Sequence, residues 1–136
     1  MKKILFFWVL LGLVCLGVAN AELLRINEQN VIVDTDNRLM WQDKSTFGKK
    51  HADSQQICQN LVLNGFDDWR LPTVNELKML MTEPSLLDSN CWTSNLKHYS
   101  NMDTAYVVAI HHNGLYVADH WVEHKEAYRC VRVSFP

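Results

Sequence analysis

The chain has 136 residues, of which 13 are Lys or Arg and 15 are Asp or Glu, so its formal charge is −2. This acidic balance, with no run of basic residues, argues against nucleic acid as a partner, because binding to phosphates requires clustered cations. The length fits one domain with a modest core and leaves no room for a second.

Residues 1–21 have the pattern of a secretory signal peptide. Lys2 and Lys3 precede an apolar run that ends at Val18, and the small-residue segment Ala-Asn-Ala follows it. The alternative is a retained membrane anchor, but the apolar run is shorter than the ~20 residues that a spanning helix needs. We expect cleavage after residue 21, a mature domain of residues 22–136 with a charge of −4, and a location in the periplasm or on the cell surface.

The first half of the mature chain predicts a hairpin and a helix. Two short apolar runs, residues 30–34 and 39–42, flank a polar segment and indicate a β-hairpin. From Lys50 to Leu63 the apolar positions recur at mostly helical spacing, and Asn64-Gly65 would end this helix. The positions that carry the pattern are Ala52, Ile57, Cys58, Leu61 and Val62.

The segment from Asp67 to Leu77 predicts the start of a second helix. Pro72 disfavours helical backbone at the residue before it, so the chain should arrive extended. Thr73 and Glu76 have the spacing of a capping box, and the apolar spacing beyond them predicts a helix from about Val74 to Met81. An aromatic and a cation that lead into such a helix are expected to brace the core rather than to line a binding site. This structural interpretation covers Trp41, Trp69, Arg70, Trp92 and Arg132.

The second half of the chain has β character. Strands are predicted at residues 91–93, 105–110, 115–118 and 127–133, and Asn113-Gly114 is predicted to occupy both central positions of a hairpin turn. In the last strand, Tyr128, Cys130 and Arg132 should alternate with Arg129, Val131 and Val133 on the opposite face. The order of a hairpin, two helices and an antiparallel β-rich half predicts an α+β fold.

A histidine-rich segment near the second hairpin is the sharpest candidate for chemistry. Imidazole and carboxylate are ligands that zinc and other transition metals prefer, and the hairpin would bring both of its strands together. His111, His120 and His124 are the candidate metal ligands, although a solvated loop whose histidines titrate with pH is the alternative. Neighbouring His111 and His112 should point to opposite faces of a regular strand. The candidate binding residues are His111, His112, Asp119, His120, Trp121 and His124, with Glu123 beside them.

The whole pattern resembles the DUF1566 family, also called the Lcl C-terminal domain family after a collagen-like adhesin. The resemblance implies a fold akin to the C-type lectin-like domain, with two helices packed on antiparallel β-sheets. The segments that carry it are Val33 to Gln42, the helix around Cys58, Gly65 to Thr73, Glu76-Leu77, Trp92-Thr93-Ser94 and Arg129-Cys130-Val131-Arg132.

Three cysteines remain in the mature chain, so one of them has no intramolecular partner. Cys58 lies in a predicted helix and Cys130 in the predicted last strand. A bridge between such positions also looks like the fold that the resemblance implies. We expect a disulfide between Cys58 and Cys130, and Cys91 is expected to be free or to link two chains in a homodimer.

The functional expectation is a secreted, non-enzymatic binding domain that recognises a glycan, a peptide or a protein surface of the cell envelope and needs no cofactor. The family's adhesin binds sulfated polysaccharides through basic surface, which this acidic chain lacks. It also lacks the Glu-Pro-Asn and Trp-Asn-Asp signatures of calcium-dependent sugar binding. One alternative is a structural or interaction subunit of an envelope assembly. A third is a metal-assisted hydrolase that uses His111, His120 and His124 with Asp119.

Overall fold

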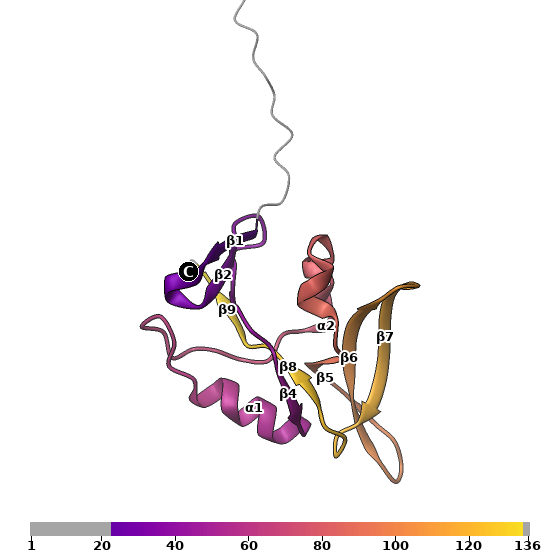
Figure 1. Ribbon diagram of the computed structural model, residues 1–136. Helices are drawn as coiled ribbons and strands as arrows, with labels where there is room; N and C mark the ends of the chain where they lie inside the picture. Colours follow the sequence, from indigo (N-terminus) through magenta and orange to yellow (C-terminus); the bar gives the residue numbers. More distant parts are fainter. Residues whose placement is uncertain (1–22, 135–136) are drawn as a thin grey trace, which may run out of the picture.

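The computed structural model describes residues 23–134, and its strands form two sheets (Figure 1). The predicted signal peptide, residues 1–21, lies outside the described residues. The first sheet is fully antiparallel, and its two edges are the first and the last strand of the described chain. In order across the sheet, its strands are β1 (Leu23–Ile26), β2 (Val31–Asp34), β3 (Leu39–Gln42) and β9 (Val131–Val133).

The second sheet has five strands and ends in the long β6–β7 hairpin. Neighbouring strands are antiparallel except β5 and β8, which meet in parallel where Cys91 is opposite Ala127. The fold is therefore α+β, as predicted, with one parallel contact in otherwise antiparallel sheets. In order across the sheet, its strands are β4 (Thr46–Lys49), β8 (Glu126–Tyr128), β5 (Cys91–His98), β6 (Asp103–His111) and β7 (Gly114–Trp121).

Two α-helices pack against this sheet from different sides. The helix α1 (His51–Asn60) contacts β5, and α2 (Val74–Lys78) contacts both β5 and β6 (Figure 1). Short 3-10 turns add the remaining helical residues: η1 (Asn27–Gln29), η2 (Met79–Thr82) and η3 (Pro84–Leu87). None of the helices in residues 23–134 is both long and apolar enough to span a membrane.

The second helix is shorter than predicted but buries the predicted face. Its α-helical part ends at Lys78, and η2 continues it to Thr82. Leu77 and Leu80 are fully buried, and Val74 packs against the same core. The start of the helix predicted from the capping box is therefore confirmed. Its last turn is a 3-10 turn and not α-helix, which is common at helix ends.

The first helix ends at Asn60, so the prediction that Asn64-Gly65 ends a helix reaching Leu63 was wrong. Asn64 and Gly65 have φ values of 55° and 78° and form a two-residue turn. Leu63 and Phe66 exchange two backbone hydrogen bonds across it, at 3.0 and 3.1 Å. Asn-Gly is one of the few dipeptides that readily adopt left-handed backbone at both central positions of a turn. Here it closes a small hairpin instead of ending a helix.

The buried face of α1 is more polar than the sequence pattern indicated. His51, Ser54 and Cys58 are the buried residues of the helix, whereas Val62, beyond its end, is 72 % exposed and Ala52 is also exposed. The side chains of His51 and Ser54 form hydrogen bonds with backbone carbonyl groups inside the domain. The His51 ring donates from Nε2 to the carbonyl of Thr93 (2.8 Å), and Ser54 donates to the carbonyl of Lys50 (2.9 Å).

The hairpin between β6 and β7 is present, but its turn is displaced by one residue from the prediction. His112 and Asn113 occupy the turn, while Gly114, with φ 108°, already pairs with His111. Of the predicted pair, only the glycine has a positive φ. In this register Ile110 is opposite Leu115, so apolar side chains share one face of the hairpin.

The predicted last strand, residues 127–133, is two strands in two different sheets. β8 belongs to the second sheet and β9 to the first, and Arg129 and Cys130 lie at the break between them. The buried Arg129 donates to the carbonyl of Gln42 (2.7 Å), and the Cys130 N–H donates to the side-chain oxygen of Gln42 (3.1 Å). These bonds satisfy the Cys130 N–H and one end of the guanidinium, whereas the buried Nε of Arg129 has no hydrogen-bond partner among the described residues. The predicted alternation of two faces is lost because the chain passes here from one sheet to the other.

Candidate functional site

The segment that leads into α2 is a polar brace. Thr73 accepts from the Glu76 N–H (3.2 Å), and the Thr73 N–H donates to the Glu76 carboxylate (2.9 Å). Arg70 donates to both oxygens of the same carboxylate, at 2.7 and 2.8 Å. Burial alone raises the pKa of Glu76, but the bonds from Arg70 and Thr73 outweigh it and hold this pKa below its ordinary value.

Three of the tryptophans are interior residues. Trp41, Trp69 and Trp92 are at most 2 % exposed. Trp69 donates from Nε1 to the carbonyl of Phe66 (3.1 Å), and Trp92 donates to the carbonyl of Lys49 (2.9 Å). Because their rings lie below the surface, they offer no face to a ligand from solution.

Arg132, in β9, contacts the segment that precedes α2. Its Nε donates to Asp68 at 2.6 Å, and its guanidinium lies 3.5 Å from the ring centre of Phe66. The hydrogen bond lowers the pKa of Asp68. The side chain of Arg132 is only 8 % exposed, so its charge acts inside the domain.

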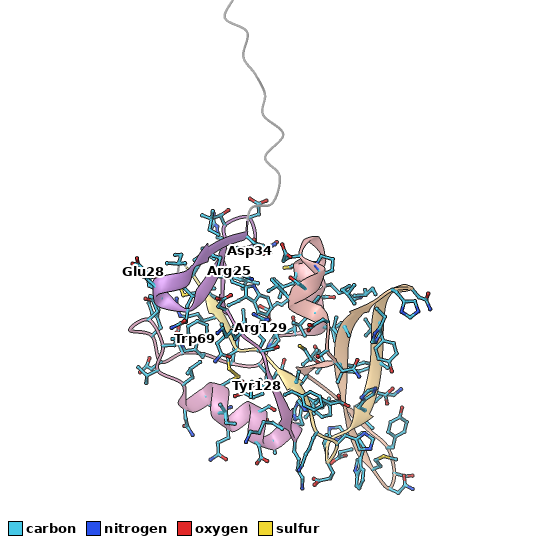
Figure 2. All side chains as sticks on the ribbon, in the orientation of Figure 1. Arg25, Glu28, Asp34, Trp69, Tyr128 and Arg129 are labelled. Atoms are coloured by element: carbon cyan, nitrogen blue, oxygen red, sulfur yellow. A yellow bond between two sulfur atoms is a disulfide. The ribbon has the colours of Figure 1, made fainter. Side chains whose placement is uncertain are left out.

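The predicted disulfide between Cys58 and Cys130 is confirmed. It joins α1 to the break between β8 and β9 across a sequence separation of 72 residues. Figure 2 shows the labelled Trp69, Tyr128 and Arg129 in the middle of the molecule, between α1 and the first sheet. Cys91 is free and 1 % exposed, and burial raises the pKa of its thiol to about 11.

A hydrogen-bonded group of polar side chains lies at the end of β7. The Nδ1 of His120 donates to the Glu126 carboxylate at 2.6 Å, and the hydroxyl of Tyr116 lies 3.1 Å from Nε2 of the same ring. Since a carboxylate only accepts, Nε2 of the neutral ring accepts from Tyr116. Glu126, His120 and Tyr116 thus form one hydrogen-bonded chain that runs from the interior to the surface.

His124 completes this group of side chains. One donor atom from each of His120, His124 and Glu126 lies within 4.8 Å of the other two. The ring of His124 also packs edge-on against Trp121, with ring centres 5.7 Å apart. The candidates Trp121, His120 and His124 are therefore brought together, and they are joined by Glu126, which the sequence pattern did not indicate.

Of the other candidate residues, Asp119 lies at the same end of β7 as His120, whereas His111 and His112 lie at the turn end of the hairpin. His111 packs edge-on against Tyr116 at the turn end of β7, with ring centres 5.1 Å apart, and His112 is an exposed turn residue. Asp119 accepts from the hydroxyls of Tyr99 (2.7 Å) and Thr104 (3.0 Å). The first of these bonds is the main cause of its lowered pKa. The structure thus separates His111 from the other two candidate metal ligands.

An open depression of about 430 Å³ lies over this end of β7. Trp121 and Tyr99 are 46 % and 43 % exposed at its surface. The depression is lined by aromatic rings, two carboxylates, two imidazoles and two hydroxyl groups. Its lining residues are Tyr99, Met102, Thr104, Asp119, His120, Trp121, His124 and Glu126.

These features define a small disulfide-bridged α+β domain whose exposed polar and aromatic groups gather at the end of a hairpin. The model of the Lcl C-terminal domain family matches residues 30–132, and the chain belongs to this family. The resemblance seen in the sequence is therefore confirmed. Comparisons with curated proteins and with solved structures found no match.

Proposed function

We propose that this chain is a secreted, non-enzymatic binding domain with a C-type lectin-like fold, and that it binds a glycan in the depression at the end of β7. Membership of the Lcl C-terminal domain family suggests a secreted domain associated with a surface. Two helices packed on two sheets, and a disulfide from α1 to the start of the last strand, support the lectin-like fold.

The observation that carries the proposal is the exposure of Trp121 and Tyr99 at one depression that also contains Asp119. An aromatic ring presents an apolar face with polar edges, which suits the C–H face of a sugar ring. Carboxylate oxygens accept hydrogen bonds from sugar hydroxyls, and the hydroxyl groups of the protein can both accept from them and donate to them. Pockets that combine apolar faces with a few placed polar groups are the usual form of a ligand site.

The charge of the site favours one class of glycan. Asp119 and Glu126 contribute two carboxylates to the depression, and the expected mature charge is −4. A sulfated or carboxylated sugar would be repelled by these groups. Neutral or amino sugars are therefore the proposed ligands.

A glycan array screened with the mature protein at two salt concentrations tests this proposal. We expect binding to neutral or amino sugars that changes little with salt. Trp121→Ala and Tyr99→Ala should each weaken that binding about tenfold, which corresponds to about 1.4 kcal/mol. Phe47→Ala is the matched control, because this aromatic residue is 70 % exposed on β4 and outside the depression. A blank array contradicts the glycan proposal.

The alternative is an interaction subunit of an envelope assembly, and the position of β7 favours it. This eight-residue strand is an edge of the second sheet and exposes Leu115, Tyr116 and Val117. An exposed edge can pair with a strand of another protein. Val117→Pro, which removes a backbone donor, would weaken such pairing, whereas sugar binding at the far end of the strand would persist.

A further inference from the structure

We propose that His120, His124 and Glu126 bind one divalent transition-metal ion, for which zinc is the best match. The proposal goes beyond the proposed function and does not rest on it, because the metal alone is the ligand. Two imidazoles and one carboxylate are among the donor sets that proteins use for zinc. Calcium and magnesium, by contrast, prefer oxygen donors throughout.

The spacing of the donor atoms is close to what a metal requires. All three lie within 4.8 Å of one another, and two donors on a tetrahedral zinc are about 3.3 Å apart. His120 and Glu126 are already in contact, at 2.6 Å. His124 is exposed, so its ring is free to turn toward the other two donors.

The backbone holds all three ligands on one short, well-anchored segment. The ends of residues 120–126 belong to β7 and β8, and the His124 N–H donates to the carbonyl of Trp121 (2.9 Å) in the turn between them. Val122 is bonded on both sides, to the N–H of His51 (3.1 Å) and to the carbonyl of Asp103 (3.2 Å). Ligands on fixed elements lose little entropy when a metal binds.

An outer contact is in place for one of the ligands. When Nδ1 of His120 binds a metal, the ring proton moves to Nε2, which then donates to the hydroxyl oxygen of Tyr116, 3.1 Å away. Contacts of this kind orient metal-bound histidines and are as much a part of such sites as the ligands themselves. Glu126, at 9 % exposure, is shielded from water that would compete for the metal.

Three protein ligands leave a fourth position of a tetrahedral metal open. All three residues line the depression at the end of β7, so this position faces a space that a ligand from solution can reach. A water molecule or an oxygen of a bound molecule would occupy it.

The test is a calorimetric titration of metal-free mature protein with zinc chloride, followed by cobalt chloride as a spectroscopic probe. We expect one zinc per chain, a higher melting temperature with zinc, and the visible absorption bands of tetrahedral cobalt. His124→Ala should weaken zinc binding at least about tenfold. Because His124 is exposed, this variant keeps the fold.

His111→Ala is the matched control, since this exposed histidine lies at the turn end of the same hairpin and is not one of the three proposed ligands. It should bind zinc as the wild type does. Glu126→Gln, which keeps the shape of the side chain, should also lose affinity while its circular dichroism spectrum stays that of the wild type.

Either of two results overturns the proposal. One is the absence of stoichiometric zinc binding, which would leave His120 and Glu126 as a hydrogen-bonded pair only. The other is equal weakening by His124→Ala and His111→Ala, which would indicate scattered binding to surface histidines. Zinc binding is measured with no glycan present, so it fails or succeeds separately from the glycan proposal.

Discussion

Arg70 and Glu76 are joined by two hydrogen bonds, at 2.7 and 2.8 Å, across the start of α2. The same carboxylate accepts from the Thr73 N–H, so one side chain both caps the helix and fixes the extended segment before it. Arg70 also lies opposite Val131 in an isolated bridge to β9. Arg70 thereby ties the helix start to the first sheet, with its side chain bonded to Glu76 and its backbone bonded to Val131.

Replacing this carboxylate should therefore destabilise the domain. Glu76→Gln removes the charge-assisted bonds but keeps the size of the side chain, and we expect the free energy of unfolding to fall by about 1–2 kcal/mol at pH 7. Glu28→Gln, at an exposed site, is the control and should change little. Urea unfolding of the three proteins measures the difference.

The effect should depend on pH. The pKa of Glu76 is below its ordinary value of 4.5, so its contribution is complete above pH 4.5 and is lost as the pH falls through the lower folded value. The gap between wild type and Glu76→Gln should shrink as the pH falls below 4.5. A gap that stays constant down to pH 2 would contradict the role of the ionised carboxylate.

His51 gives a second pH dependence. Burial lowers its pKa from the ordinary 6.5, although the bond to the Thr93 carbonyl acts in the opposite direction. As the pH falls, His51 takes up a proton in the unfolded chain before it does so in the folded chain. Protonation of His51 therefore leaves the free energy of unfolding unchanged above pH 6.5 and lowers it between pH 6.5 and the lower folded pKa. His51→Gln should lose less stability than the wild type between pH 7 and pH 5, as measured by melting temperature. His112→Gln, in the exposed turn, should retain the wild-type slope.

Loss of the disulfide should have the largest effect of any change considered. The bridge closes a loop with a sequence separation of 72 residues, which corresponds to about 4 kcal/mol in the chain-entropy treatment. The double variant Cys58→Ser, Cys130→Ser should unfold at correspondingly lower urea. Reductant should shift the wild type in the same direction and leave the double variant unchanged, and an equal response of both would refute the assignment.

Cys91 should be inert in the folded protein. At a pKa of about 11, roughly one thiol in a thousand is ionised at pH 8, and the side chain is 1 % exposed. A thiol-reactive dye should label the native protein slowly and the denatured, unreduced protein at one site. Immediate labelling, or a dimer band that disappears with reductant, would show that Cys91 reaches the surface.

The sequence could predict those parts of the fold that depend on neighbouring residues. The capping box at Thr73 and Glu76 and the hairpin of β2 and β3 need only local backbone geometry, and both are present. The break between β8 and β9 was missed because it depends on Gln42, which is 88 residues from Cys130 in sequence. The apolar alternation of residues 127–133 gives no sign of such a distant partner.

In the candidate site, too, the sequence predicts the grouping of residues that are close in the chain and not of those that the fold brings together. His120, Trp121 and His124 are close in sequence and stay together in the fold, whereas His111 pairs with Gly114, at the opposite end of β7 from His120. Glu126 was overlooked because its approach depends on the turn that returns the chain from β7 to β8. Its two-residue spacing from His124 gives no usable signal, because His124 lies in the turn and not in a strand.

The division of the final strand between two sheets has a consequence for the timing of folding. Residues 126–133 supply the strand between β4 and β5 and also the strand that completes the sheet of β1 to β3. A nascent chain that lacks this short segment has neither sheet in its final form, nor the second cysteine of the bridge. Neither sheet nor the disulfide can therefore be completed before residues 126–133 are in place, which couples the closure of both sheets to one short segment.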